Sequence, residues 1–164
     1  NQTFTGGTGN DAFTTTYANL AWKTINAGLG TDTVTVTDAV TAAFSLATSS
    51  AAGAALAGVD IVNFNAVNTN TVTMFNGAAT VNTAGGTFIL GSGGQTVNAT
   101  GAVTVTGGTG ADTIALSSGA DTIIGSGSTF ATIDTVSGFK AAGADVFKTG
   151  TAATTLNALS IANA

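Results

Sequence analysis

Short runs of alternating apolar and polar residues recur along the chain at nearly constant spacing. The apolar centres of seven runs lie 9, 8, 8, 8, 9 and 9 residues apart, at Val72, Val81, Ile89, Val97, Val105, Ile114 and Ile123. Glycine or asparagine interrupts most of the intervals, and the alternation turns one face of each strand inward. One strand with one turn cannot bury its apolar face alone, so the units must stack. The pattern predicts an all-β parallel β-solenoid, of the β-roll or β-helix type.

The stretch from residue 12 to residue 59 is less regular. Residues 46–57 are rich in alanine and serine, and we expect either one short helix or a loop there. Residues 59–64 predict a strand, because β-branched and aromatic residues favour extended backbone. The glycines are spread evenly and no linker interrupts the chain. We therefore expect residues 1–164 to form a single domain.

A short phrase of glycines followed by aspartate returns along the chain. It is complete at residues 6–13 and 107–114, and at 27–34 alanine replaces its first glycine. The phrase reads G-G-x-G-x-D-x-apolar, which is a calcium-binding β-helix repeat. Glycine lets the backbone turn sharply and present its carbonyl oxygens, and aspartate adds a carboxylate. Ca²⁺ binds about six to eight such oxygens, so the phrase predicts calcium ions at the turns of the solenoid.

The spacing of the aspartates predicts which of them share an edge. Asp11 and Asp32 are 21 residues apart, close to one full turn, and would lie about 5 Å apart on one edge. Asp112 and Asp121 are nine apart and should lie on opposite edges. Two partly dehydrated carboxylates repel by a few kcal/mol at an effective dielectric of about 20, so they must take up protons or share a cation. The alternative is that each aspartate only closes its own Asx turn.

Two asparagines are also separated by a structural repeat. Asn82 and Asn98 lie 16 residues apart, two units of eight. They can stack as an asparagine ladder inside one edge of the coil, or each can close its own turn. Spacing alone leaves both alternatives open.

The composition narrows the possible partners. Charged residues make up 7% of the chain, all eight acids are aspartate, and the net charge is −5. Three lysines cannot form a phosphate-binding surface, so no nucleic-acid partner is expected. No run of 18 apolar residues is present, so we expect no membrane span. Since cysteine is absent, neither a disulfide framework nor a thiolate metal site is expected.

Catalytic residue sets are missing as well. Without histidine or cysteine there is no catalytic triad, zinc-bound water or thiolate nucleophile. A pair of aspartates could in principle hydrolyse a glycoside. However, every aspartate lies in a turn phrase or beside a strand, without arginine or histidine nearby. The chain is therefore not expected to be an enzyme.

The phrases at 6–13, 107–114 and 27–34 resemble those of the repeats-in-toxin (RTX) calcium-binding family, and residues 118–124 resemble its degenerate repeats. The Thr-, Ala-, Gly- and Val-rich solenoid around them looks like surface-layer proteins of Gram-negative bacteria. The resemblance implies Ca²⁺ as the cofactor. The metal ligands it implies are Gly6, Thr8, Asp11, Gly28, Asp32, Gly107, Thr109, Asp112, Asp121 and Asp134.

The same resemblance implies a function. It implies type I secretion and calcium-dependent folding outside the cell, as part of a longer secreted protein. The expected role is a self-assembling structural protein of the cell surface, a homo-oligomer in a surface layer (S-layer) or filament, with cell-surface polysaccharide as a further possible partner. The alternative is an RTX-type adhesin or the C-terminal calcium-folding domain of a secreted hydrolase.

Overall fold

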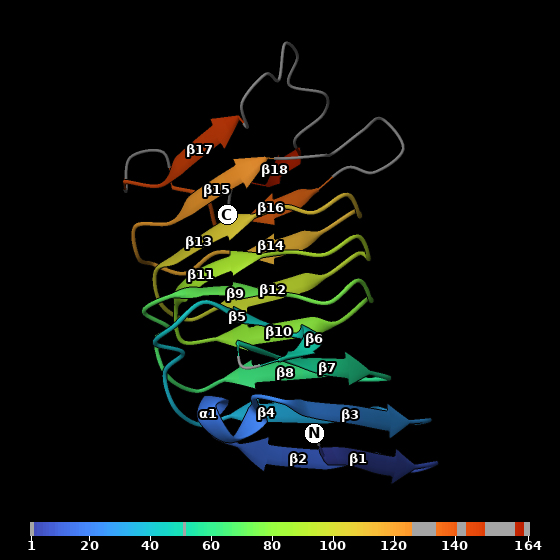
Figure 1. Ribbon diagram of the computed structural model, residues 1–164. Coiled ribbons are helices and arrows are strands. Elements are labelled where there is room, and N and C mark those ends of the chain that lie inside the picture. The colour runs from blue at the N-terminus through green and yellow to red at the C-terminus, as the bar shows by residue number, and fades with distance from the viewer. Residues whose placement is uncertain (1, 51, 126–133, 141–143, 150–159, 163–164) are drawn as a thin grey trace.

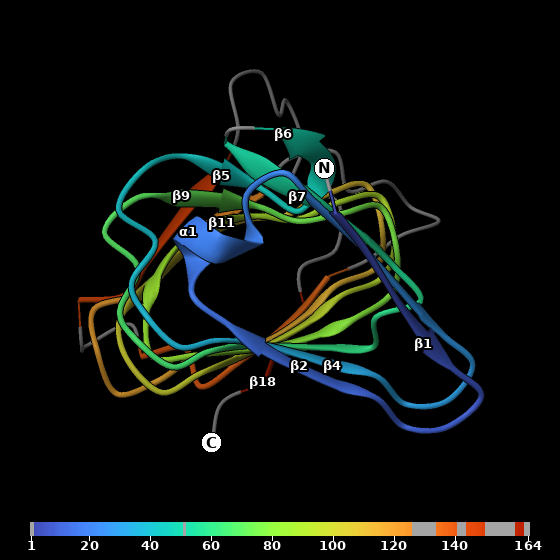
Figure 2. The same cartoon turned by 60° about the horizontal axis from the view of Figure 1, so that its bottom comes forward.

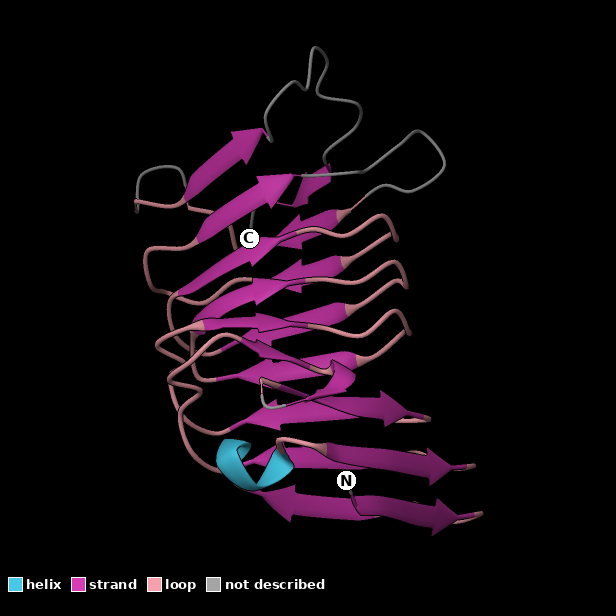
Figure 3. Cartoon of the chain, in the orientation of Figure 1, coloured by secondary structure: helices cyan, strands magenta, loops and turns pink. Residues whose placement is uncertain are grey.

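The computed structural model describes residues 2–50, 52–125, 134–140, 144–149 and 160–162. In this part of the chain, short strands form two parallel sheets that face each other around an apolar core (Figures 1 and 3). The chain passes from one sheet to the other and back, and each passage stacks on the one before it. The expected parallel β-solenoid is confirmed.

The first sheet, sheet A, contains ten strands. Nine of them follow in the spatial order β1 (Gln2–Gly7), β3 (Lys23–Gly28), β7 (Gly53–Ala57), β5 (Phe44–Ser45), β9 (Thr71–Thr73), β11 (Gly86–Ile89), β13 (Val103–Thr106), β15 (Thr122–Gly125) and β17 (Val146–Thr149). The tenth, β6 (Ala47–Ser50), pairs antiparallel with β7.

The second sheet, sheet B, contains eight strands. Their order is β2 (Ala12–Thr15), β4 (Thr33–Val36), β8 (Ile61–Phe64), β10 (Thr80–Thr83), β12 (Thr96–Ala99), β14 (Thr113–Ala115), β16 (Thr135–Ser137) and β18 (Ser160–Ala162). Strands β1 and β2 therefore end the two sheets at one pole, and β17 and β18 end them at the other.

Apolar side chains stack in columns inside the coil. In sheet A, Phe88 pairs with Val72 on one side and Val105 on the other, and all three are fully buried. The prediction was wrong at Ile89, which is 39% exposed. Phe88 and Leu90 point inward instead, because successive side chains of a strand alternate between faces. Six of the seven predicted centres are buried.

The sequence left a short helix or a loop open within residues 46–57, and most of the described residues there form strands instead. Strands β6 and β7 occupy this region, and Leu56 of β7 pairs with Ile25 of β3. Ala54 and Leu56 of β7 are buried, while Ala55 and Ala57 are more exposed, so the strand turns its larger apolar side chain inward. The extra strand β5 then lies between β7 and β9.

The one helix of the described residues, α1 (Tyr17–Leu20), lies at the N-terminal end of the coil (Figure 2). The hydroxyl of Thr16 caps it by accepting from the main-chain N–H of Asn19, and Leu20 is buried. Within the described part of the chain, no helix has the length and apolarity needed to cross a membrane.

The asparagine ladder is present, but outside the coil. The amide of Asn98 donates to Oδ1 of Asn82 (2.9 Å), and the amide of Asn82 donates to Oδ1 of Asn63 (2.9 Å). Asn98 is exposed while its neighbour Val97 is buried. The ladder therefore runs along the outer face of sheet B and joins β8, β10 and β12.

Candidate metal centre

The turns that lead from sheet A to sheet B form one edge of the solenoid, which we call the loop edge. In each of these turns, one residue lies directly before the following strand of sheet B. The strand register aligns it from coil to coil. We call this alignment the rung column; it contains Asp11, Asp32, Asp60, Ala79, Gln95, Asp112 and Asp134.

Each carboxylate of the rung column after Asp11 accepts a hydrogen bond from the coil on its N-terminal side. The donor is the main-chain N–H of the previous rung residue. The bonds are Asp11 N to Asp32 Oδ1 (2.8 Å), Asp32 N to Asp60 Oδ2 (2.8 Å), Gln95 N to Asp112 Oδ1 (2.8 Å) and Asp112 N to Asp134 Oδ1 (3.0 Å). The column is therefore a ladder that ties neighbouring turns together.

Several rung residues also close their own turn. The main-chain N–H of Gly7 donates to Oδ2 of Asp11 (2.9 Å), and that of Gly108 donates to Oδ2 of Asp112 (3.2 Å). Each donor lies four residues before its acceptor. The turn-closing role and the stacked arrangement, which the sequence left as alternatives, thus occur together in the same side chains.

Apart from Gly7 and Gly9, the glycines of the phrase are required mainly because the turns stack backbone on backbone. A Cβ on Gly108 would overlap the carbonyl oxygen of Gly91, and a Cβ on Gly91 would overlap that of Phe75. Among the phrase glycines only Gly28 (φ +107°) and Gly30 (φ +135°) adopt a left-handed conformation. Close approach, more than turn geometry, therefore excludes other residues from these positions.

Gln95 stands in one rung where most other rungs have aspartate. Its hydrogen bonds show which groups surround a rung side chain. It is 1% exposed, and its Oε1 accepts from the N–H of Gly91 (3.0 Å), as an aspartate would. Its Nε2 donates to two carbonyl oxygens of the turn beneath, those of Phe75 (2.9 Å) and Gly77 (3.0 Å). A positively polarised group thus fills the space between the rung side chain and the adjacent turn.

The aspartate rungs present oxygen where Gln95 presents nitrogen. The carbonyls of Gly91 and Gly93 lie under the turn of Asp112, as those of Phe75 and Gly77 lie under the turn of Gln95. A carboxylate is an acceptor only. An aspartate rung therefore cannot donate to these carbonyls as Gln95 does, and at Asp112 both side-chain oxygens accept from main-chain N–H groups, those of Gln95 and Gly108. Where a carboxylate oxygen has no such donor, carboxylate and carbonyl oxygens together suit Ca²⁺ or Mg²⁺ rather than softer metals.

Asp32 gives the clearest sign of an unmet charge. The residue is fully buried, and its Oδ2 has no hydrogen-bond partner in the described structure. A buried, unpaired carboxylate oxygen is strongly unfavourable unless it is protonated or paired with a cation. The residues around this rung therefore fit a bound cation.

A second pair of carboxylates meets at Gly107. The space that a Cβ would fill there lies 3.0 Å from Oδ2 of Asp134 and 3.9 Å from Oδ2 of Asp112. Burial raises the pKa of Asp112, as does the charge of Asp134, and main-chain hydrogen bonds from Gln95 and Gly108 oppose the rise. This face of Gly107 is a second place where a cation would relieve repulsion.

The opposite edge carries a separate, shorter ladder. The N–H of Val103 donates to Oδ1 of Asp121 (2.8 Å), and the N–H of Asp121 donates to Oδ1 of Asp145 (3.0 Å). The second oxygen of Asp145 accepts from the N–H of Lys140 (2.7 Å). Oδ2 of Asp121 is buried and lacks a partner among the described residues, like that of Asp32.

The structure divides the predicted ligands between the two edges as expected. Asp11 and Asp32 share the loop edge, and Asp112 and Asp121 lie on opposite edges. The remaining predicted residues, Gly6, Thr8, Gly28, Gly107, Thr109 and Asp134, lie in or beside the loop-edge turns.

Three residues of the two ladders were not among the ligands expected from the sequence. They are Asp60, Gln95 and Asp145, and none belongs to a complete glycine phrase. The spacing of 17 between Gln95 and Asp112 was the available signal. In the described residues no three acidic side chains converge on one point, so a cation would take its other ligands from main-chain carbonyls.

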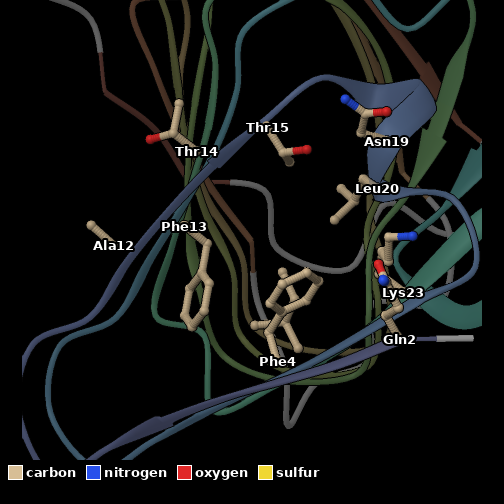
Figure 4. Close-up of a pocket in the computed structure, with 10 residues that line it drawn as sticks. Gln2, Phe4, Ala12, Phe13, Thr14, Thr15, Asn19, Leu20 and Lys23 are labelled. Atoms are coloured by element: carbon tan, nitrogen blue, oxygen red, sulfur yellow. The ribbon is translucent and has the colours of Figure 1, made fainter.

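Two of the hollows lined by described residues bear on the site. One, of about 440 Å³, opens in the loop edge between the turns at Gly58 and Gly77, beside Asp60. It lies where β5 adds a strand to sheet A. The other, of about 480 Å³, opens at the N-terminal pole, where Figure 4 shows Phe4, Phe13 and Leu20 lining the interior of the first coil.

No protein-family model, no curated protein and no solved structure matches the chain. The chemistry of the two edges is therefore the basis for inferring a function.

Proposed function

We propose that the chain is a structural β-solenoid of the cell surface, which folds with bound Ca²⁺ and assembles with further copies of itself into a surface layer or filament. The observation that best supports cation binding is the fully buried carboxylate of Asp32, whose Oδ2 has no partner among the described residues. A buried carboxylate oxygen of this kind is unfavourable unless it is protonated or paired with a cation, and a bound cation is the alternative that we propose.

The chain's own residues would hold the cations in three places. On the loop edge these are the rung of Asp32, with the turn carbonyls of Gly7 and Gly9, and the pair Asp112 and Asp134 around Gly107. On the opposite edge it is the rung of Asp121. A bound cation supplies positive charge between stacked turns, so its binding free energy becomes folding free energy. Sites of low charge density are typical of extracellular modules that bind calcium at about 0.1–1 mM.

A structural role follows from the character of the surface. The sheets present mainly threonine and asparagine outward, as in the ladder of Asn63, Asn82 and Asn98. Both poles carry strands at the ends of the sheets, and such edges favour pairing with further strands. Calcium binding would stabilise the folded solenoid. Only the folded solenoid presents strand edges at its poles, so assembly would depend on calcium. Cell-surface polysaccharide remains a further proposed partner.

Electron microscopy of the purified chain tests the proposal. With millimolar calcium we expect ordered sheets or filaments, and EGTA should disperse them. Magnesium at the same concentration is the control for ionic strength and general divalent charge. Calcium-dependent folding without any assembly would favour the adhesin or the folding domain of a secreted hydrolase. Monodisperse, folded protein in both calcium and EGTA would contradict the proposal.

A further inference from the structure

The outer face of the central strands of sheet A carries a regular array of threonines. Strands β9, β11, β13 and β15 lie side by side (Figure 1), and the inward residue of each is buried. The residues on either side of it face outward, because successive side chains of a strand alternate between faces. The residue before the inward one is threonine in all four strands. We call these residues the first rank: Thr71, Thr87, Thr104 and Thr122.

The strand register holds the first rank in line. Thr87 pairs with Thr71 on one side and with Thr104 on the other, and Thr104 pairs with Thr122. All these pairings are parallel, and paired strands lie about 4.8 Å apart. Because threonine is β-branched, its side chain is stiff about χ1. The hydroxyl and methyl groups of the first rank therefore repeat at a fixed interval across the sheet.

A second rank of outward residues runs beside the first. It follows the inward residue of each strand and lies two residues from the first rank, a distance of about 6.7 Å along the strand. Its members are also in register, and none of the four strands contains a charged residue. The face is thus an uncharged two-dimensional grid of hydroxyl and methyl groups. The second rank consists of Thr73, Ile89, Thr106 and Ile124.

The outer face of sheet B differs from this grid. It also has a rank of threonines, among them Thr80, Thr96 and Thr113, which are in register. Its second rank, however, is the asparagine ladder, in which the amide of Asn98 donates to Asn82. On the sheet A face, the hydroxyls of both ranks have no hydrogen-bond partner among the described residues. Their hydrogen bonds are therefore available to a ligand.

The shape and chemistry of the grid restrict the kind of ligand. Small molecules bind in concave sites, and the two hollows described above open at the loop edge and at the N-terminal pole instead. The four strands present no carboxylate for a calcium mineral and no outward aromatic ring on which a sugar could stack. A threonine hydroxyl both donates and accepts hydrogen bonds. A matching ligand is an uncharged solid whose surface also presents donors and acceptors at regular intervals.

We propose that this face binds ice. The grid repeats at about 4.8 Å and about 6.7 Å, close to the oxygen repeats of about 4.5 Å and about 7.4 Å on the prism face of hexagonal ice. Water ordered by the hydroxyl and methyl groups would therefore fit an ice surface with little rearrangement. The inference goes beyond the proposed function and does not rest on it, because a single molecule presents the whole face.

Microscopy of single ice crystals in a solution of the chain with calcium tests the proposal. The wild type should shape the crystals into facets and lower their freezing temperature below their melting temperature. In Thr104→Tyr, a ring stands above the centre of the grid and keeps the ice surface away, so both effects should be lost. The matched control is Thr96→Tyr on the outer face of sheet B, which should keep both effects.

Circular dichroism and urea midpoints show whether the variants fold. Both should match the wild type, because the substituted side chains face outward and tyrosine favours strands. Thr87→Lys is a second variant of the first rank, in which a hydrated charge opposes contact with ice. It should lose both effects as Thr104→Tyr does, so the test does not depend on one substitution.

Several results would overturn the inference. They are folded wild type without any effect on ice, folded first-rank variants with undiminished effects, or a loss in Thr96→Tyr as large as that in Thr104→Tyr. Wild-type dimers that Thr104→Tyr separates, without an effect on ice, would make this face an interface between copies instead.

The outcomes also separate this inference from the proposed function. Ordered assemblies in calcium without an effect on ice would overturn only ice binding. Shaped ice crystals without ordered assemblies would support ice binding and count against self-assembly.

Discussion

Asp32 and Gln95 occupy equivalent positions of the rung column but differ in the hydrogen bonds that their side chains make. The Nε2 group of Gln95 donates to two carbonyls of the adjacent turn. Asp32 has no such group, and one of its oxygens is buried without a partner in the described structure. The amide of Gln95 is thus fully hydrogen-bonded, whereas the carboxylate of Asp32 keeps one oxygen without a partner among the described residues.

Asp32→Asn tests this difference. The asparagine keeps an oxygen for the N–H of Asp11 and replaces the unpartnered oxygen by an uncharged amide. In EGTA we expect the free energy of unfolding to rise by about 1–3 kcal/mol, the scale of an unsatisfied buried polar group. In calcium the stabilisation by the ion should shrink by a similar amount. Urea unfolding followed by circular dichroism measures both.

The matched control for this variant is Asp38→Asn. Asp38 also accepts one main-chain N–H, that of Tyr17 (2.7 Å), but it is half-buried and outside the rung column. Its calcium response should equal that of the wild type. If Asp32→Asn and Asp38→Asn behave alike, the rung of Asp32 binds no cation.

The pH dependence of the calcium-free chain follows from Asp112. Its pKa is raised in the fold from an ordinary value of 3.8, first by burial, so the folded chain holds this proton to a higher pH than the unfolded chain does. The resulting stabilisation is complete below pH 3.8 and disappears as the pH rises through the raised pKa. In EGTA the urea midpoint should therefore fall with rising pH.

Two controls accompany the pH series. The slope should flatten in Asp112→Asn, although the loss of one acceptor lowers the whole curve. Calcium should also flatten it in the wild type, because a cation stabilises the ionised form. A midpoint in EGTA that rises with pH over the same range in the wild type but not in Asp112→Asn would contradict the assignment.

At the scale of the element, the neighbouring turn decides whether a given turn position requires glycine. Gly7 and Gly108 hold the same place in the two complete phrases. Gly108 lies directly over the carbonyl of Gly91, whereas Gly7 has open space on the corresponding side. The phrase is identical in both places, and the neighbour decides whether its glycine is needed.

Alanine substitutions separate the two cases. Gly108→Ala must displace main chain and should lower the free energy of unfolding by roughly 1–3 kcal/mol, as overpacking does. Gly7→Ala in dilute protein should change it by less than about 0.5 kcal/mol. Urea midpoints of the two variants in calcium measure the difference. Equal losses would mean that turn conformation, rather than stacking, selects glycine.

The sequence predicted the coil but not all of its local details. Period and alternation identified the strands, because a solenoid repeats one requirement many times. The inward residue near Ile89 was misplaced by one position, since Phe88, Ile89 and Leu90 are all apolar. The strands within residues 46–57 were missed because alanine and serine carry little periodic signal, and the pairing with β3 decides their structure.

The candidate site was only partly predictable for a similar reason. Complete glycine phrases identified Asp11 and Asp112. Asp60 and Gln95 lie in degenerate turns, and only their register with neighbouring coils places them in the rung column. The spacing of successive rungs varies between coils, from 16 residues between Ala79 and Gln95 to 28 between Asp32 and Asp60.

At the scale of the whole molecule, charge is absent from the centre and present at both ends. No charged residue occurs between Asp60 and Asp112. The amide of Gln95 and the ladder of Asn82 and Asn98 join the central coils instead. The cations that we propose would therefore bind the coils at the two ends, and the hydrogen bonds of the central coils do not depend on them.

Hydrogen exchange of the wild type, followed by mass spectrometry in calcium and in EGTA, tests the central claim most directly. The account predicts that amides in strands β1–β4 and in strand β14 lose protection by at least 100-fold in EGTA. Amides within 61–106 should change by less than about 10-fold. Equal protection of all strands in calcium and in EGTA, with the solenoid intact, would contradict it.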